Sequence, residues 1–408
     1  ENHSGIVLIS GTINSLASTK KNYKFQILGN RIGLLENSLL DVSGNKGGGE
    51  IIIGNRDTLA TYIDSKAFLK ADAVNTGDGG SINVSATKST RAYGTFSAKG
   101  SLNNGNGGLI DISGNNFLDV RDINTDTTAN NGLNGDLLFK SNNILLVSQG
   151  YFRNAENDEF DFFQPSKGGT VLDAYTIEKQ LSSGNNITIA ADSTDSELGN
   201  LKADRVYIEP TNNSPITLTF QAANDISFSK GYIQPISNRL GVVLQADTNG
   251  SGKGNISLGN GIPYSFKINT KGEKFSASAI SILLSGAEIM SSFSNANDSE
   301  SIVLGVENDS GSQNRDIINK NITNQEKLNY EVSGIDISAK NDILMQQSGI
   351  IKENSSAANS GDIKINADSF YIQVGGIENN TSGSGDAGDI NFKVNFLSVK
   401  SGGTNCVT

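Results

Sequence analysis

Carboxylates are the residues most able to do chemistry in this chain, and five aspartates lie within one short region: Asp111, Asp119, Asp122, Asp126 and Asp136. Two carboxyl groups suffice to hydrolyse a glycosidic bond when one is protonated and the other ionised. Asp111 alternates with Ile110 and Ile112, so it is expected on the solvent side of a strand. This pattern favours solvated carboxylates, and we expect no catalytic residues among them.

Nucleophilic and zinc chemistry lack the residues that they need. The only histidine is His3 and the only cysteine is Cys406, close to opposite ends of the sequence. Ser/His/Asp and Cys/His catalysis require these side chains side by side, and zinc requires several such ligands. We therefore expect no enzyme activity, no metal site and no cofactor.

One acidic segment offers a possible calcium site. Residues 154–161 contain Glu156, Asp158, Glu159 and Asp161, and oxygen ligands at such spacing suit Ca²⁺. A solvated acidic loop explains the same residues, so both interpretations stay open. The segment Ser382–Asp389 approaches a calcium-binding repeat motif, but only once.

Aromatic side chains surround that acidic segment, namely Tyr151, Phe152, Phe160, Phe162 and Phe163. They could anchor a partner or cover an apolar patch of this protein.

Composition limits the possible partners. The 408 residues carry a formal net charge of −11, which argues against nucleic acid as a partner. No apolar run approaches the roughly 18 residues of a membrane-spanning helix. The chain does not begin with Met and shows no signal segment, so we interpret it as a piece of a longer protein.

A fixed period points to the elements that hold these residues. Gly334, Gly361 and Gly388 are 27 positions apart, and so are Gly349, Gly376 and Gly403. Regular repeats of this length are typical of solenoids, in which each repeat stacks on the previous one.

Apolar pairs repeat in the same manner near the start of the chain. Each pair is spaced by two, as expected for one face of a strand, and follows a glycine: Ile51 and Ile53, Ile82 and Val84, Ile110 and Ile112, Leu137 and Phe139. A parallel β-helix satisfies this pattern, because equivalent residues lie about 4.8 Å apart along its axis and form core stacks. We therefore predict an all-β chain that forms a parallel β-helix of about fifteen turns, with irregular loop excursions.

Two finer matches concern the register of neighbouring turns. Phe117, Leu118 and Val120 correspond to Ile144, Leu145 and Val147, all 27 positions later. Asn115 and Asn116 likewise precede Asn142 and Asn143 by 27, and stacked asparagines are either a hydrogen-bonded ladder or turn residues. Near the end, Ile335 corresponds to Ile363 at 28, while Ile343 corresponds to Phe370 at 27.

The organisation along the chain follows from these repeats. We predict β-helix turns over residues 1–150, an excursion with a helical turn over 151–192, irregular turns and loops over 193–332, and regular 27-residue turns over 333–408. The helical turn is expected at 177–181, and residues 306–331 are expected to form a polar loop.

Three segments also carry a family resemblance: Arg31–Asn55, Asp78–Thr125 and Thr176–Asp192. In order and spacing they resemble the filamentous haemagglutinin family, and the last repeats, within 334–403, resemble the short repeats of that family. The chain departs from the family in having no Asn-Pro pair and no tryptophan before Thr90–Gly94. The part that engages the secretion pore is therefore expected to lie outside this sequence.

The resemblance implies a right-handed parallel β-helix, secretion through an outer-membrane pore transporter, and an extracellular or cell-surface location. It also implies adhesion to a host-cell or bacterial surface ligand, either protein or glycan. Two alternatives share the fold: a carbohydrate-active enzyme and a haem-carrier binding exoprotein. Because one fold serves many functions, the fold alone does not choose among them.

Overall fold

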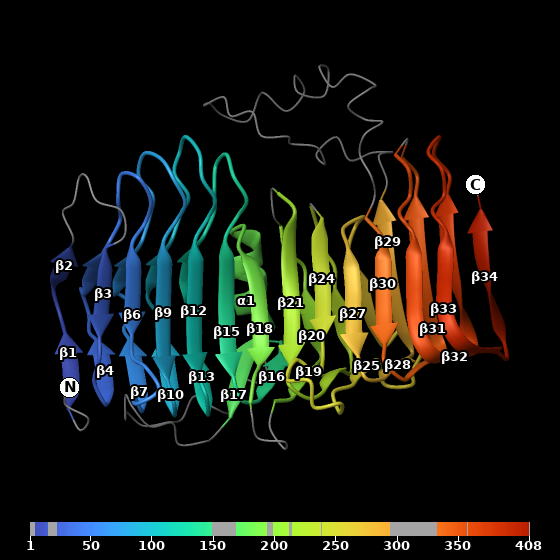
Figure 1. Ribbon diagram of the computed structural model, residues 1–408, viewed down its shortest axis with the longest axis horizontal. Coiled ribbons are helices and arrows are strands. Elements are labelled where there is room, and N and C mark those ends of the chain that lie inside the picture. Colours follow the sequence, from blue (N-terminus) through green and yellow to red (C-terminus); the bar gives the residue numbers. More distant parts are fainter. Residues whose placement is uncertain are drawn as a thin grey trace. The chain divides into compact units, whose positions relative to one another are not determined.

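The chain folds almost entirely into parallel strands. The computed structural model describes residues 5–14, 23–148, 169–193, 199–211, 214–237, 239–293, 333–356 and 358–407. It contains 54% strand and 3% helix, and the strands wind into a parallel β-solenoid of about 11 turns (Figure 1). The predicted parallel β-helix is confirmed.

The number of turns is lower than the predicted fifteen because some turns are much longer than 27 residues. Phe139 pairs with Ile189, 50 positions later, and Ala277 pairs with Ile337, 60 positions later.

The chain divides into two compact units. Unit 1 comprises Glu1–Lys202 and Phe220–Ala223, and unit 2 comprises Ala203–Thr219 and Asn224–Thr408. Strands β19 (Leu201–Asp204) and β21 (Ile216–Ala222) contain residues of both units.

Three stacks of strands build unit 1. The first stack is β1 (Ile6–Ile9), β4 (Arg31–Leu34), β7 (Ala60–Ile63), β10 (Ser89–Ala92) and β13 (Phe117–Asp119). The second is β2 (Thr12–Asn14), β5 (Leu39–Asp41), β8 (Phe68–Lys70), β11 (Thr95–Ser97) and β14 (Asn124–Asp126). The third is β3 (Lys24–Ile27), β6 (Glu50–Ile53), β9 (Ser81–Ala86), β12 (Leu109–Gly114), β15 (Asp136–Ser141) and β18 (Asn186–Ala191).

The core of unit 1 follows the predicted apolar pairs. Ile51, Ile82, Ile110 and Leu137 are in register on consecutive strands, and all are fully buried. The second members of the pairs form a parallel buried stack. Burial alternates along β9, β12 and β15, because successive side chains point to opposite faces of a strand.

Glycines allow adjacent turns to approach closely just before these strands. A Cβ atom on Gly80 would lie 2.0 Å from the Gly49 oxygen, and one on Gly108 would lie 2.0 Å from the Gly80 oxygen. Gly135 repeats this contact against Gly108. No other residue fits where backbone meets backbone at this distance.

The predicted stacking of β13 on the strand 27 positions later is wrong. That strand, β16 (Ile144–Val147), pairs instead with β17 (Thr170–Asp173). β17 in turn contacts β13, since the Leu118 amide donates to Thr170 Oγ1 at 2.9 Å and the Gly169 amide donates to the Asn116 oxygen at 3.2 Å. Strand β17, from later in the sequence, thus lies between β13 and β16. A fixed 27-residue period does not predict such an insertion.

The asparagine pairs behave partly as a ladder. Asn142 donates from Nδ2 to Asn116 Oδ1 at 3.3 Å, one position away from the predicted partner Asn115. The Asn143 Oδ1 accepts from the Asn200 amide at 2.8 Å, so it also supports the next turn.

The single α-helix of the described residues, α1 (Ala174–Ser182), follows β17 and confirms the predicted helical turn at 177–181. Asp173 caps its first turn by accepting a hydrogen bond from the Tyr175 amide. Gly184, with φ at +93°, lies just beyond the C-terminal end, where a left-handed residue commonly terminates a helix. No helix of the described residues is both long and apolar enough to cross a membrane.

Unit 2 also consists of strands in parallel register. One stack is β24 (Leu240–Gln245), β27 (Phe275–Ala279), β30 (Ile335–Ala339), the first part of β32 (Ile363–Thr381) and β33 (Ile390–Val399). Another is β22 (Ile226–Phe228), β25 (Ile256–Leu258), β28 (Ile282–Ser285) and the first part of β31 (Asp342–Asn354). The third is β20 (Val206–Ile208), β23 (Gly231–Ile233), β26 (Phe266–Asn269) and β29 (Ala287–Phe293), continued by β31, β32 and β34 (Gly402–Val407).

The 27-residue glycine repeat is confirmed for one of the two predicted sets, since Gly349 pairs with Gly376, which pairs with Gly403. In the other set, Gly361 aligns with Gly388, but Gly334 aligns with Asp362, because the turn between them has 28 residues. The mixed spacing is also confirmed: Ile335 pairs with Ile363, and Ile343 pairs with Phe370. Ile363 is fully buried, whereas Ile390 on β33 is half-buried.

Candidate binding groove

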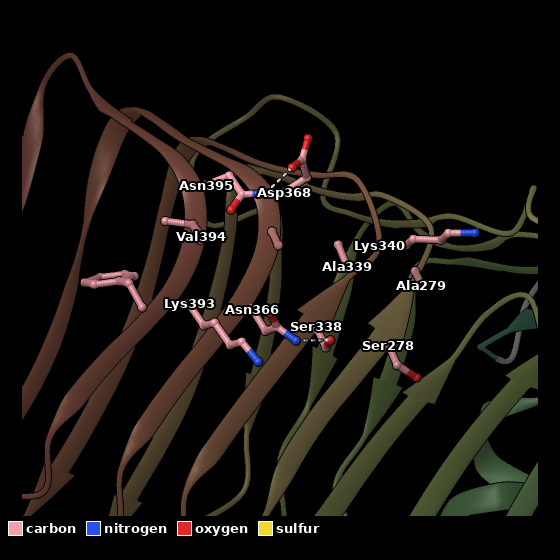
Figure 2. Close-up of a pocket in the computed structure, with 12 residues that line it drawn as sticks. Ser278, Ala279, Ser338, Ala339, Lys340, Asn366, Asp368, Lys393, Val394 and Asn395 are labelled. Atoms are coloured by element: carbon pink, nitrogen blue, oxygen red, sulfur yellow. Dashed lines mark hydrogen bonds between the residues drawn. The ribbon is translucent and has the colours of Figure 1, made fainter.

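A groove in unit 2 brings together polar side chains from four consecutive strands. It has a volume of about 740 Å³ and lies where β27, β30, the first part of β32 and the middle of β33 approach a corner of the solenoid (Figure 2). None of its residues was singled out from the sequence.

The apolar part of the groove lining consists of three alanines together with Phe392 and Val394. Ala279, Ala339 and Ala367 end consecutive strand segments and are 9%, 6% and 7% exposed. Burial alternates along β27 and β30, and these alanines are on the buried face. In the sequence each of these alanines lies two positions after a buried residue, and the same spacing occurs at Val84 and Ala86 of unit 1, so no sequence signal singles out the groove.

One wall is a row of outward polar side chains in register. Ser278 pairs with Ser338, Ser338 with Asn366, and Asn366 with Lys393. Figure 2 shows these four side chains following one another across neighbouring strands, with a 3.5 Å contact between Asn366 Nδ2 and Ser338 Oγ. They repeat once per turn, about every 4.8 Å.

The other wall comes from the residues just past the corner, Lys340, Asp368 and Asn395. Asn395 donates from Nδ2 to Asp368 Oδ1 at 2.7 Å, which occupies one carboxylate oxygen. Within the described part of the chain, neither Lys340 nor Lys393 forms an ion pair. The groove thus presents hydroxyl, amide and ammonium donors along a line.

A second groove, of about 550 Å³, lies at the opposite ends of the same strands. Two of its four carboxylates are paired, because Lys274 lies 2.9 Å from Asp336 and Lys364 lies 3.3 Å from Asp362, while Asp386 and Asp389 make the groove acidic overall. The Asp389 amide donates to Asp362 Oδ1 at 3.0 Å, so this carboxylate also joins two turns.

Two fully buried polar side chains support that second groove from inside. Lys352 and Asn379 are in register on neighbouring turns. Lys352 Nζ donates to the Ser333 oxygen at 2.6 Å, and Asn379 Nδ2 donates to the Gly388 oxygen at 2.7 Å. Burial lowers the pKa of Lys352 to about 8, although nearby Asp362 opposes the shift.

Of the five aspartates considered for catalysis, Asp111 and Asp136 lie on the outward face of the third stack of unit 1, whereas Asp119 is on β13 and Asp126 is on β14. Asp111 pairs with Leu138, and Asp136 pairs with Leu109, so the two carboxylates sit on adjacent turns two positions apart. Contrary to expectation, Asp111 is half-buried rather than solvated, and its Oδ1 has no hydrogen-bond partner among the described residues. Burial raises the pKa of both Asp111 and Asp136.

No group of three or more His, Cys, Asp or Glu residues that could hold a metal ion occurs in the described ranges. The calcium motif considered at Ser382–Asp389 contributes differently: the Asp386 amide donates to Asn359 Oδ1 at 3.0 Å, linking two turns. The acidic segment 154–161, the aromatic residues around it, the predicted loop 306–331 and His3 lie outside the described residues.

The chain was compared with known proteins by sequence. No protein-family model matches it, and a search of curated proteins finds no match.

Proposed function

We propose that this chain is part of a secreted bacterial surface protein that acts as an adhesin and binds a glycan in the groove of unit 2. The observation that carries the proposal is the row Ser278, Ser338, Asn366 and Lys393, which offers one polar side chain per turn. Its spacing of about 4.8 Å is close to the length of one sugar residue in an extended chain. The resemblance to the filamentous haemagglutinin family supports the same role.

The groove favours an extended and hydroxyl-rich ligand over a compact one. Its apolar lining consists of three alanines with Phe392 and Val394, and its walls hold donors and acceptors in lines rather than converging on one point. A polymer lying along the solenoid axis would meet equivalent groups on successive turns. Each contact would be modest, and affinity would come from repetition along the polymer.

Secretion through an outer-membrane pore transporter and an extracellular location belong to the same proposal, and they rest on the family resemblance. Expression of the protein's gene in a Gram-negative host, with and without a gene for an outer-membrane pore transporter of this secretion class, tests them. We expect export only when both are present.

Binding is tested with the intact chain on an array of neutral and acidic polysaccharides. The informative variant is Asn366→Ala with Asp368→Ala, which removes polar groups from both walls. A matched control is Asn391→Ala, an exposed asparagine of β33 outside the groove. We expect the double variant to lose polysaccharide binding and the control to retain it. Absence of binding by the unaltered chain across the array contradicts the proposal.

A carbohydrate-active enzyme is the second candidate. Asp111 and Asp136 share one face, and their Cα atoms are roughly 8 Å apart, as judged from strand and turn spacing. An inverting glycosidase needs one protonated and one ionised carboxyl group on the same face, and the half-buried Asp111, whose pKa is raised, is the candidate for the acid. Incubation with the same polysaccharides decides the matter: release of reducing ends that Asp136→Asn abolishes supports an enzyme, and no release excludes it.

A further inference from the structure

A separate cluster on unit 1 contains an arginine, Arg91, for which the described residues supply no hydrogen-bond acceptor. Tyr62, Arg91 and Asp119 occupy equivalent outward positions on β7, β10 and β13, one turn apart. Tyr93 and Phe117 lie beside them on the same strands or just after. None of these residues belongs to the groove of unit 2.

The carboxylates near Arg91 already have their own donors. Asp119 is 5% exposed and accepts from Arg121 Nε at 3.0 Å, from Arg121 Nη2 at 2.6 Å and from the Tyr93 hydroxyl at 2.8 Å. Burial raises the pKa of Tyr93, so its phenol keeps the proton that it donates. Asp64 accepts from the Tyr62 hydroxyl at 3.2 Å and from the Lys66 amide at 2.9 Å.

Arg91 itself is left incomplete. Its guanidinium carbon lies 5.5 Å from the centre of the Phe117 ring, which orients the group. Its Nε is buried and has no hydrogen-bond partner, and no ion pair of the described residues includes Arg91. A guanidinium is always charged and carries five donors, so partial burial without an acceptor is unfavourable. An acceptor from outside the chain would remove this cost.

The surroundings of Arg91 indicate which acceptor fits. A planar guanidinium matches a carboxylate through two parallel hydrogen bonds. Tyr62 lies one turn away and packs edge-on against Tyr93, with ring centres 6.1 Å apart. Both tyrosines are half-buried, so their rings offer apolar surface beside the charge. A ligand that joins a carboxylate to a ring uses both features.

We infer that Arg91 binds the carboxylate of an acidic sugar, such as a uronic acid, and that the sugar ring rests against Tyr62. This site lies in unit 1 and involves none of the groove residues. The inference is therefore independent of the proposed glycan-binding groove and of the proposed adhesin function, and a negative result for one does not affect the other.

The test is calorimetric titration of the full chain with three probes: glucuronate, glucose and acetate. Glucose lacks the carboxylate, and acetate lacks the ring. We expect glucuronate to bind more tightly than acetate, and glucose not to bind at this site. Arg91→Gln should weaken glucuronate binding about tenfold or more, since it removes a charge-assisted hydrogen-bond pair.

Arg56→Gln is the matched control, because Arg56 is an exposed arginine of the same unit. It should leave glucuronate binding unchanged. Tyr62→Leu gives a second readout that keeps Arg91, and it should weaken glucuronate but not acetate. No glucuronate binding by the unaltered chain, or equal losses in the Arg91 and Arg56 variants, overturns the inference. Acetate binding as tightly as glucuronate overturns the sugar assignment.

Discussion

Buried polar residues show how single side chains shape this protein. Lys352 is fully buried, yet its ammonium group has a backbone carbonyl as partner, so it holds the corner at Ser333 in place. Burial costs more for the charged form than for the neutral amine, which is why the pKa falls to about 8. A neutral amine still donates a hydrogen bond, so the bond from Lys352 to the Ser333 oxygen remains after deprotonation.

This lysine predicts a specific pH dependence. Between pH 8 and its ordinary pKa of 10.5, the unfolded chain binds more protons at Lys352 than the folded chain. Stability should therefore rise with pH across that window, by up to about 3 kcal/mol from this group. Urea unfolding at pH 7.5 and 9.5 measures the change. Lys352→Met should lack this rise, and an identical pH response in both proteins would contradict the assigned burial.

Helix α1 and the residues after it cover the free edge of strand β14. The edge of β14 that faces away from β11 exposes backbone groups of residues 123, 125 and 127, which a next strand would normally bond. Gln180 Oε1 accepts from the Thr125 amide at 3.0 Å, and its Nε2 donates to the Ile123 oxygen at 2.7 Å. Asn185 Oδ1 accepts from the Thr127 amide at 2.9 Å. Two side-chain amides thus replace a strand.

Gln180→Ala should destabilise unit 1 by roughly 2 kcal/mol or more, because it leaves a buried amide and a buried carbonyl without partners. Chemical denaturation followed by circular dichroism measures the loss. Lys179→Ala is the control: its ammonium contacts Asn124 of the same strand, but on the exposed side. A change below about 0.5 kcal/mol is expected there. Equal effects of the two substitutions would mean that the amide does not close the edge.

Glycine ladders are the second element-scale feature. Gly108→Ala places a methyl group 2.0 Å from the Gly80 oxygen, so the two turns must separate. A loss of about 2 kcal/mol is expected from this overpacking. Gly403→Ala meets nothing within 4 Å and should be tolerated. Thermal unfolding of the two variants compares them, and a stable Gly108 variant would show that the turns are farther apart than described.

At the scale of the molecule, stability comes from neighbouring turns. Each turn contacts the turns before and after it, so damage should spread along a stack and fade with distance. Unit 1 and unit 2 each have their own core stacks, which makes separate unfolding of the two units the natural expectation.

Ile112→Asp tests this. Ile112 is fully buried between Val84 and Phe139, so a carboxylate there is desolvated without a partner. Hydrogen exchange should lose protection in β9, β12 and β15 of unit 1, while β27 and β30 of unit 2 retain theirs. Equal loss of protection in both units would show that they unfold as one cooperative unit. No loss of protection would show that the face of β12 that carries Ile112 lies outside the core.

The sequence predicted the parts of the fold that depend on inward residues. Ile51, Ile82, Ile110 and Leu137 recur because every turn must supply the same core stack. The sequence did not predict strand β17, because β17 joins its stack out of sequence order. Phe117 and Ile144 remain 27 positions apart in the sequence although β17 lies between their strands. Outward residues obey no such constraint. The groove and the Arg91 cluster each combine several turns, so neither has a contiguous motif that the sequence could reveal.

The amides that close β14 have a consequence for how copies of this protein meet. An open parallel edge recruits strands from other molecules and leads to dimers or fibres. Gln180 and Asn185 occupy the donors and acceptors that such a recruit would need. Strand addition by a second molecule is therefore blocked at this edge, and substitution of both amides would leave its backbone donors and acceptors open to such pairing.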